Sequence, residues 1–514
     1  MKRWLVFLLV IVCIYSLAGA VSGGSSLPEN RSLARSPDSY FRRPGIQQIV
    51  PGDFEFLIYL KDQADLSQAG DLSTKEEKGR YVVAQLRSMA LQTQEPVLSE
   101  LERMGVEYRS YWIANMIWVR GNRELAQAFA AWPDVAHIYE NPEVLMEEPE
   151  PSEQDFEPST VSGVTWNIDE VNADEAWAAG VTGEGVVIGG QDTGYDWDHP
   201  ALINSYRGWD GSTVDHNYNW HDAINTANDN CDGKSAFPCD DHGHGTHTMG
   251  IMVGDDGAGA QIGMAPGAKW IGCRNMKNGV GTPKSYIECF EWFLAPYALQ
   301  ESPQKGDPTK APDIINNSWT CTVEEGCIDP NLLRDVVENV RAAGILVVAA
   351  AGNDGPECST ITEPPGMYDA SFTVGNTNSE DEINFTSSRG PVVIEENILL
   401  KPDITAPGTG IYSSLPGTGY AFLTGTSMAA PHVAGQAALL ISADPSLRGQ
   451  VDEIEDIIRM TAEQKPSVDV CGGDAPGGIA PNNTYGYGVV DAGRAVALTK
   501  LDYFYYLPVV VNGD

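Results

Sequence analysis

The chain has 514 residues, of which 42% are hydrophobic and 20% charged, so it is neither a disordered nor a fibrous protein. At roughly 100–200 residues per domain, this length predicts two or three domains. The net charge of −39 argues against nucleic acid and anionic membrane surfaces as partners, because both require clustered Lys and Arg. Before position 146 the 17 acidic residues are nearly balanced by 15 basic ones, so the later part of the chain carries most of the negative charge.

The first twenty residues have the pattern of a secretory signal. Lys2 and Arg3 precede the apolar run 4–17, small residues follow it, and cleavage is expected after Ala20. A membrane anchor is the alternative interpretation, but the run is shorter than the ~18–20 apolar residues that span a bilayer, and no second run follows. We therefore expect residues 1–20 to be a signal peptide and the protein to be secreted into the extracellular space without a membrane anchor.

A flexible leader and a small α+β module are expected next. Residues 21–50 are rich in Ser, Pro and Arg and show no periodicity, which is typical of a flexible leader. Within residues 51–145 the patterns predict strands at 53–60, 106–112, 115–119 and 135–139 and helices at 75–104 and 123–131. The order βαββαβ over ~90 residues predicts a ferredoxin-like module that is large enough to fold alone.

An acidic linker separates this module from the rest of the chain. Residues 147–158 hold six acidic residues and three prolines, a composition that cannot bury a core, so residues 146–162 are expected to be exposed and open to proteolysis. Apolar, strand-like runs then alternate with helical segments, at 185–190, 270–274, 313–316, 345–350 and 371–374. This alternation predicts an α/β domain at 163–500, with a parallel sheet between crossover helices. The aromatic and β-branched tail 501–514 is an edge strand, a remnant or a sorting signal.

Eight cysteines follow the signal segment. An even number in an oxidising compartment favours disulfides over a metal site, and the chain has no CxxC motif. Close spacing favours the pairs Cys231–Cys239 and Cys321–Cys327. The pairing of the other four cysteines stays open.

Three Gly-rich segments in the acidic part carry candidate catalytic side chains. An apolar run ends in Asp192 and a Gly turn, which places this carboxylate at the C-terminal end of a strand, where open α/β sheets bind ligands. Residues 241–250 (DHGHGTHTMG) form a polar loop that enters a helix. Residues 425–435 (GTSMAAPHVAG) put Ser427 near a helix N-terminus, whose dipole favours a developing negative charge.

A serine hydroxyl becomes a useful nucleophile only when a base takes its proton and a carboxylate orients that base. The chain offers an Asp, a His and a Ser in that order, each in its own Gly-rich turn, which is the order found in subtilisin. A helix N-cap is the alternative role for Ser427, and the accompanying Asp and His motifs disfavour it.

Three motifs resemble the signatures of the subtilisin-like serine proteases, peptidase family S8: DTG (192–194), HGTH (244–247) and GTSMAAP (425–431). The resemblance implies that Asp192 is the orienting carboxylate, His244 the general base and Ser427 the nucleophile. It also implies the family's fold, a parallel sheet sandwiched by helices, and covers roughly residues 165–500.

Two further motifs extend the resemblance to the substrate cleft. AAAGNDG (349–355) resembles the family's oxyanion turn, which implies Asn353 as the side-chain donor to the oxyanion, beside the backbone N–H of Ser427. INNSW (315–319) resembles the strand against which substrates of the family lie antiparallel. The substrate-binding candidates are therefore Ser318, Trp319, Thr320 and Gly352, with His242, two residues before the catalytic His, as a further one.

Some segments resemble the bacillopeptidase F branch of the family in particular, namely IGMAPGAKW (262–270), EWFLAP (291–296) and PDIINNSW (312–319). The module at 51–145 resembles the inhibitory pro-domain of these proteases, whose C-terminal end occupies the active site until it is cut. The resemblance implies a secreted, monomeric serine endopeptidase that acts on polypeptides through an acyl-enzyme and is made as a zymogen that processes itself. The alternatives are a binding protein on a protease fold and a processing protease with one partner substrate.

The chain departs from the family pattern at two places. HPAL (199–202) has Ala201 where relatives often carry a calcium-binding Asp, and the loop 254–263 keeps only Asp255 and Asp256 as acidic residues. Because calcium takes about six to eight oxygen ligands, this site looks incomplete, although the acidic body could hold another calcium ion. No cofactor is expected for the chemistry. At the substrate strand, Thr320 and Cys321 replace the usual Gly, which would narrow or shift the cleft.

The remaining histidines of the motifs are expected to be structural. His247 and His432 lie beyond the reactive positions and are interpreted as buried, hydrogen-bonded residues. His216 and His221 are interpreted as ordinary loop residues.

Overall fold

The structure, a computed structural model, describes residues 54–146, 150–151, 163–228, 230–257, 259–321, 327, 329–394 and 397–500. All of them belong to one structural unit that runs from Ile49 onward. The expected signal peptide, the leader, the C-terminal tail and most of the linker 146–162 lie outside the described residues.

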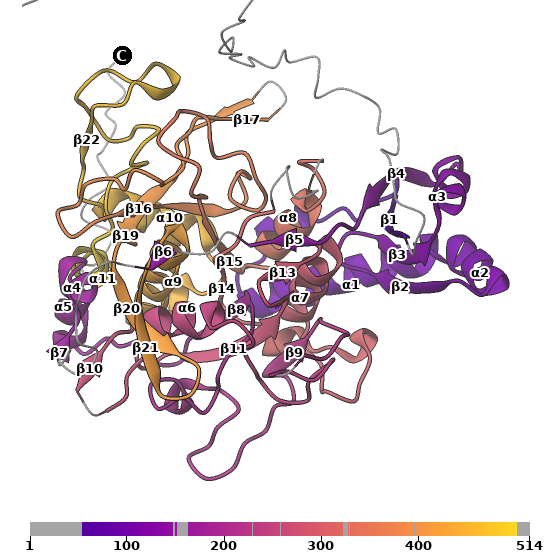
Figure 1. Ribbon diagram of the computed structural model, residues 1–514, viewed down its shortest axis with the longest axis horizontal. Coiled ribbons are helices and arrows are strands. Elements are labelled where there is room, and N and C mark those ends of the chain that lie inside the picture. The colour runs from indigo at the N-terminus through magenta and orange to yellow at the C-terminus, as the bar shows by residue number, and fades with distance from the viewer. Residues whose placement is uncertain are drawn as a thin grey trace, which may run out of the picture. The chain divides into compact units, whose positions relative to one another are not determined.

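The N-terminal module, residues 54–140, is a four-stranded antiparallel sheet with the strand order β2-β3-β1-β4 and three helices (Figure 1). Its elements are β1 (Phe54–Leu60), α1 (Lys75–Thr93), α2 (Glu95–Met104), β2 (Glu107–Tyr111), β3 (Met116–Gly121), α3 (Arg123–Ala130) and β4 (Val135–Glu140). The small α+β fold expected for this region is confirmed.

The single helix expected over residues 75–104 is in fact two helices that meet at Gln94. Pro96 has no N–H to donate to the preceding turn, so the hydrogen-bond ladder of the first helix cannot continue through it. The buried side chain of Gln94 donates instead to the backbone O of Tyr111 and to Asn115 Oδ1, both at 3.0 Å. The junction is therefore tied to the β2–β3 turn.

The larger part of the chain is built on a seven-stranded sheet in which all neighbouring strands are parallel, in the order β19-β16-β15-β14-β8-β11-β9. The strands are β8 (Val187–Asp192), β9 (Trp220–Asp222), β11 (Lys269–Arg274), β14 (Ile314–Asn317), β15 (Leu346–Ala350), β16 (Phe372–Thr377) and β19 (Ile404–Pro407). The subtilisin-like sheet expected from the sequence is confirmed, and its five inner strands lie where the apolar runs predicted them.

The two edge strands, β9 and β19, were not expected from the sequence. β9 has three residues and β19 has four, so neither presents an apolar run of the usual strand length. Among the described strands of this sheet, β9 pairs only with β11 and β19 only with β16, and Thr405 of β19 also forms an isolated bridge to Val489.

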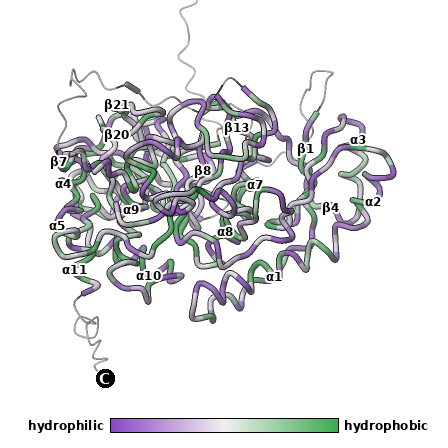
Figure 2. The backbone as a smooth tube through the Cα atoms, turned by 90° about the horizontal axis from the view of Figure 1, so that it is seen from below, coloured by the Kyte–Doolittle hydropathy of each residue, from purple (hydrophilic) through white to green (hydrophobic). Residues whose placement is uncertain are grey.

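Helices cover both faces of this sheet. Alternate side chains of the strands point to opposite faces, so Ile315 and Val347 pack in one hydrophobic cluster and Ile314, Leu346 and Val348 in the other. The first cluster contains α7 (Pro283–Leu294) and α8 (Arg334–Ala342), and residues of the N-terminal module join it. The second contains α4 (Trp166–Glu170), α5 (Ala173–Ala178), α6 (His244–Val253), α9 (Thr426–Ala443), α10 (Val451–Thr461) and α11 (Ala492–Lys500). In Figure 2 hydrophobic stretches lie in the interior around β8 and α9.

Short strands complete the fold. They are β5 (Val144–Leu145), β6 (Glu150–Pro151), β7 (Gly163–Val164), β10 (Ala260–Gln261), β12 (Met276–Lys277), β13 (Val280–Gly281), β17 (Val392–Ile394), β18 (Asn397–Leu399), β20 (Ile411–Leu415), β21 (Gly419–Thr424), β22 (Pro466–Ser467) and β23 (Gly478–Ile479). Within the described ranges, none of the helices has the length and apolar character needed to span a membrane.

Candidate active site

Asp192 ends β8 at the C-terminal edge of the parallel sheet, and its side chain is buried. Its Oδ1 accepts a hydrogen bond from the backbone N of Thr193 at 2.7 Å, and its Oδ2 accepts one from Thr248 Oγ1 at 3.4 Å. These bonds hold the carboxylate at the edge where parallel sheets place their functional groups.

His244 is the first residue of α6, and its imidazole meets the carboxylate of Asp192. The Nδ1–Oδ1 distance is 2.7 Å, and both side chains are buried. Gly243 makes this approach possible, because it turns the chain into the helix at φ 101°, which a residue with a Cβ rarely adopts. With Nδ1–H donated to the carboxylate, Nε2 is the nitrogen that can accept a proton.

Ser427 is the second residue of α9, directly after the turn at Gly425. Its Oγ donates to the backbone O of Ser318 at 3.0 Å, and Ser318 Oγ donates back to the O of Ser427 at 2.8 Å. This reciprocal pair fastens the start of α9 to the end of β14.

Asn353 is held against the same helix start. Its Oδ1 accepts hydrogen bonds from the backbone N of Thr426 at 3.0 Å and from Thr426 Oγ1 at 3.2 Å, which leaves Nδ2 to act as a donor. A Cβ built on Gly425 would lie 3.8 Å from both Asn353 Nδ2 and Ser427 N, so these two donors border one small space. Gly352, at φ 96°, donates its N–H to Thr426 Oγ1 at 3.2 Å and holds the turn in place.

The substrate-binding candidates lie at different depths. The ring of Trp319 is buried and stacks on Tyr286 at 4.0 Å between centroids, so only its backbone can reach a substrate. Thr320 is half-buried. The half-buried ring of His242 lies 6.4 Å from that of His244 and faces Gly279 in the turn between β12 and β13. Their roles in binding stay predictions.

Two short strands that follow the N-terminal module pair with two hairpins, β12–β13 and β20–β21. β5 pairs antiparallel with β13, and the N–H of Met146 donates to the O of Gly279 at 2.8 Å. β6 pairs antiparallel with β21, which leads directly into Gly425 and Ser427. The backbone on either side of residues 147–149 is therefore bound as an added strand, before them to β13, whose turn faces His242, and after them to β21, which leads into Ser427.

Sequence reasoning missed Asp240, which joins the turns of the aspartate and the histidine. Its Oδ1 accepts from Thr193 Oγ1 at 2.9 Å and from the N–H of Gly243 at 2.8 Å, and its Oδ2 accepts from the N–H of Thr246 at 3.0 Å. Thr193 Oγ1 in turn accepts from the N–H of Gly245 at 3.0 Å. An acidic residue just before a helix start is the signal that could have identified it.

The structure pairs all eight cysteines found after the signal segment. Both pairs expected from spacing are present, with Cα–Cα distances of 5.8 Å for Cys231–Cys239 and 5.6 Å for Cys321–Cys327. The other two are Cys273–Cys289, at 5.7 Å, and Cys358–Cys471, at 5.2 Å.

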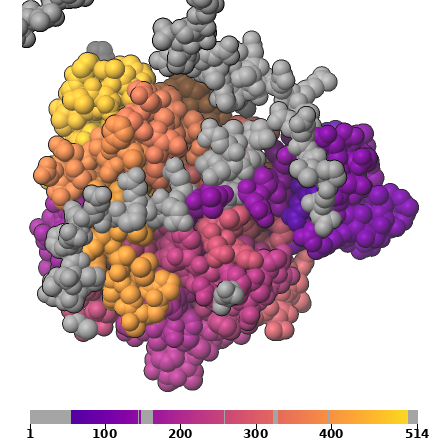
Figure 3. Space-filling view, viewed as in Figure 1, coloured from indigo at the N-terminus to yellow at the C-terminus, as the bar shows by residue number. Residues whose placement is uncertain are grey.

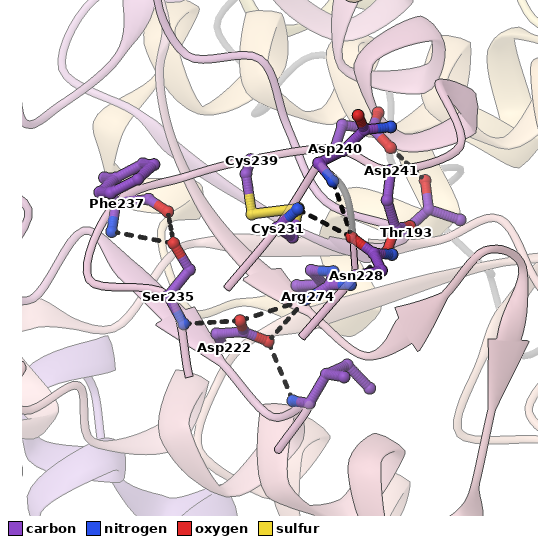
Figure 4. The surroundings of a disulfide bond; sticks show 12 residues. Thr193, Asp222, Asn228, Cys231, Ser235, Phe237, Cys239, Asp240, Asp241 and Arg274 are labelled. Atoms are coloured by element: carbon purple, nitrogen blue, oxygen red, sulfur yellow. Dashed lines mark hydrogen bonds and ion pairs between the residues drawn. A yellow bond between two sulfur atoms is a disulfide. The ribbon is translucent and has the colours of Figure 1, made fainter. Parts of the chain in front are cut away.

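The Cys231–Cys239 bridge closes the loop that precedes the histidine turn (Figure 4). Beside it the buried guanidinium of Arg274 pairs with Asp222 at 3.2 Å and with Asp241, which lies next to Asp240. The disulfide and the ion pairs together brace this loop.

His247 and His432 are fully buried, as expected of structural residues. His247 Nε2 lies 3.1 Å from the O of Ala421, and His432 Nδ1 lies 2.9 Å from the O of Met428. Burial lowers the pKa of His247 to about 3 and that of His432 to about 4, so both are neutral near pH 7. His221 differs from its expectation as a loop residue, because it lies in β9 and its Nε2 is 3.0 Å from Glu288 Oε1.

The loop expected to lack a calcium site uses its carboxylates for its own backbone. Asp255 Oδ1 accepts from the N–H of Gly257 at 2.8 Å, and Asp256 Oδ1 accepts from the N–H of Gly259 at 3.0 Å. Across the part of the chain that the structure describes, no group of three or more His, Cys, Asp or Glu side chains could hold a metal ion. The expectation that the family's usual calcium site is incomplete stays a prediction.

Comparisons with known proteins agree with this geometry. The profile of the subtilase family (Peptidase_S8) matches residues 183–488. Bacillopeptidase F of Bacillus subtilis is 35% identical over 472 residues, which cover 86% of this chain and 31% of that protein. Subtilisin E of Bacillus subtilis is 31% identical over 285 residues, covering 55% of this chain and 62% of that protein. This chain thus spans about a third of the length of bacillopeptidase F.

A solved structure supports the fold alone. The crystal structure of the epidermin leader peptide processing serine protease of Staphylococcus aureus is similar to this chain with a TM-score of 0.61 and 15% sequence identity. The match covers 86% of this chain and 99% of that one.

Proposed function

Because the chain belongs to the subtilase family of serine peptidases, we propose that it is an endopeptidase that hydrolyses polypeptides through Asp192, His244 and Ser427. The observation that carries the proposal is the 2.7 Å hydrogen bond between His244 and Asp192 at the strand edge where α9 presents Ser427.

The proposed reaction starts when Ser427 Oγ turns from the O of Ser318 toward the imidazole. His244 Nε2 takes the hydroxyl proton as Oγ attacks the scissile carbonyl, and Asp192 stabilises the imidazolium that forms. The proton then passes to the leaving amine, whose departure gives an acyl-enzyme. Water attacks the ester with the same histidine as base and frees Ser427.

Two donors support the negative charge that develops on the carbonyl oxygen. Asn353 Nδ2 and the N–H of Ser427 border the same space beside Gly425, and the start of α9 adds its positive dipole end. Donors held before the reaction begins need no reorganisation, which is why such sites lower the barrier more than water does.

The same site supports a zymogen that processes itself. The N–H of Met146 is bound to the O of Gly279 and Glu150 pairs with the end of β21, which leads into Ser427, so the bond to be cut is proposed to lie between these two residues. The N-terminal module would then act as the intramolecular inhibitor of a secreted enzyme, with the catalytic domain beginning after the cut.

A fluorophosphonate probe tests the proposal directly. We expect covalent labelling of wild-type protein at Ser427 and none of the Ser427→Ala variant, because only an activated serine attacks such a probe at neutral pH. A folded wild-type protein that stays unlabelled after its linker has been cut would mean a binding protein on a protease fold.

A further inference from the structure

The N-terminal module meets the rest of the chain at α7 and at the start of β14, where two ion pairs bridge the contact. Arg109 Nη1 of β2 lies 2.6 Å from Glu288 Oε1 of α7, and the Glu288 side chain is only 1% exposed. Lys75 Nζ of α1 lies 2.9 Å from Oδ1 of Asp313, whose side chain is 5% exposed. Figure 3 shows the module, in indigo to purple, against the surface of the later residues.

Glu288 is surrounded by donors from both sides of the contact. Tyr111 of the module donates its hydroxyl to Oε2 at 3.0 Å, while Lys284 at 3.5 Å and His221 at 3.0 Å belong to the larger domain. Burial by itself would raise the pKa of Glu288, but Arg109, Lys284 and His221 outweigh it and hold the pKa well below its usual value. The carboxylate is therefore charged while the module is docked.

Asp313 likewise has partners both in the N-terminal module and in the larger domain. Its Oδ2 accepts from the N–H of Val187 at 3.0 Å and its Oδ1 lies 3.2 Å from Arg448 Nε, both within the larger domain. Lys75 adds the bond from the module and also donates to the O of Ala311 at 2.8 Å. Both carboxylates thus stay with the larger domain when the module leaves, and both lose a cation.

We propose that the ion pairs Arg109–Glu288 and Lys75–Asp313 are the contacts by which this protease recognises its own pro-domain. The same two contacts would retain the pro-domain after the linker is cut. This proposal rests on the proposed role of the N-terminal module as an inhibitor. The apolar side chains at the contact favour binding of any module that packs well against them, so they do not distinguish one module from another. A module without these two cations would bury Glu288 and Asp313 with one ionic partner fewer each, Glu288 keeping Lys284 and His221 and Asp313 keeping Arg448, and removing one partner of a buried carboxylate is unfavourable for binding.

In the full chain, the two ion pairs can be tested by measuring how long the cut module stays bound and inhibits the protease. Mass spectrometry follows the linker cut and a peptide substrate follows the onset of activity, so the interval between the two events reports how long the cut module stays bound. We expect Arg109→Met and Lys75→Met each to shorten the interval at least ~10-fold, because losing one member of a buried pair mainly raises the dissociation rate. Arg80→Met is the matched control: Arg80 also lies on α1, but it is 59% exposed and pairs with Glu76 of the same helix.

A double-mutant cycle distinguishes the loss of this ion pair from a general loss of folding stability. Glu288→Gln removes the charge from the other side of the pair, and combining it with Arg109→Met should shorten the interval by less than the product of the two single effects. Fully multiplicative effects, or an interval that none of the variants changes, would overturn the proposal.

Hydrogen exchange in the uncut Ser427→Ala chain tests the contacts without any catalysis. The amides of Trp112 and Ile113 donate to Glu291 Oε2 at 2.6 and 3.2 Å, so their exchange reports undocking of the module. Arg109→Met should speed their exchange ~10-fold and Arg80→Met should not, whereas equal exchange in all variants would overturn the proposal. The two proposals can also fail separately. If the wild type never cuts its linker but the amides of the Arg109→Met chain exchange faster, the result would contradict the protease function and leave the role of the ion pairs intact.

Discussion

The active-site edge of the sheet and the docking face of α7 both rest on buried carboxylates, but the two regions use them differently. Asp192 and Asp240 accept hydrogen bonds from turns of their own domain, so their partners stay whether or not the N-terminal module is attached. Glu288 and Glu291 accept bonds from the module itself, so these partners would leave with it in the proposed release. Under the proposed release, the active-site edge is the permanent region, and the docking face of α7 is the separable region.

The largest effect is expected in the permanent region. Ser427→Ala and His244→Ala should each lower kcat by about 10⁶, the loss found for the same changes in subtilisin, because proton transfer to the base and attack by the serine are lost together. Peptide hydrolysis by chains freed of the module by an added protease measures this effect. Variants that kept a tenth of the wild-type kcat would show that another group is the nucleophile or base.

A smaller loss is expected at the oxyanion donor. Asn353→Ala should lower kcat by about 10²–10³ with little change in KM, because its Nδ2 is proposed to act mainly in the transition state. The same change removes the bonds to Thr426 at the start of α9, so thermal unfolding should be recorded in parallel. An enzyme with wild-type kcat would remove Asn353 from the oxyanion site.

A substitution of Asp240 tests whether kcat depends on the hydrogen bonds that join the aspartate turn to the histidine turn. Asp240→Asn keeps the shape of the side chain but sets an NH₂ group against backbone N–H donors, so His244 should shift slightly and kcat should fall about 10–100-fold. Asp210→Asn is the control, because that exposed carboxylate also caps backbone N–H groups but lies in a distant turn. Equal kcat in both variants would limit Asp240 to a structural role.

At the docking face of α7, the binding of the N-terminal module should depend on pH. Burial raises the pKa of Glu291 to about 7, against the opposing effects of Arg109 and the amides of Ile113 and Trp112. Glu288 also raises this pKa, and Arg87 faces the same carboxyl. A Glu291 that is solvated after release would return toward its ordinary pKa of about 4.3.

Docking of the module therefore takes up a proton, and the contribution of that proton to binding is lost as the pH rises through about 7. The interval between linker cutting and activity should shorten about tenfold from pH 6 to pH 8. Glu291→Gln, which cannot ionise, should flatten this dependence. A steep dependence that survived in Glu291→Gln would assign it to another group.

The two regions also differ in how much of them the sequence predicts. The aspartate, histidine and serine turns are short, Gly-rich and locally determined, so their motifs identify Asp192 and His244, whose side chains the fold brings to 2.7 Å, and Ser427, which bonds to the chain just beyond β14; their catalytic roles stay predictions. Asp240 could have been recognised as an acidic residue just before a helix start. The βαββαβ module and the five inner strands follow from patterns of apolar residues, whereas β9 and β19 are too short to have one.

The docking face depends on residues that only the fold brings together. Arg109 and Glu288 are far apart in the sequence and neither lies in a motif, and His221 reaches Glu288 only because β9 lies beside α7. The Cys273–Cys289 bridge joins β11 to α7 for the same reason, and spacing alone could not favour it over other pairings.

The most direct test of the whole account is the N-terminal sequence and intact mass of the wild-type protein, produced from the full chain, beside its Ser427→Ala twin. The account predicts that the wild type begins between residues 147 and 150 and that the twin keeps its N-terminal module, because Ser427 is proposed to cut the chain between the two segments that pair with β13 and β21. A twin cut at the same bond as the wild type would contradict it.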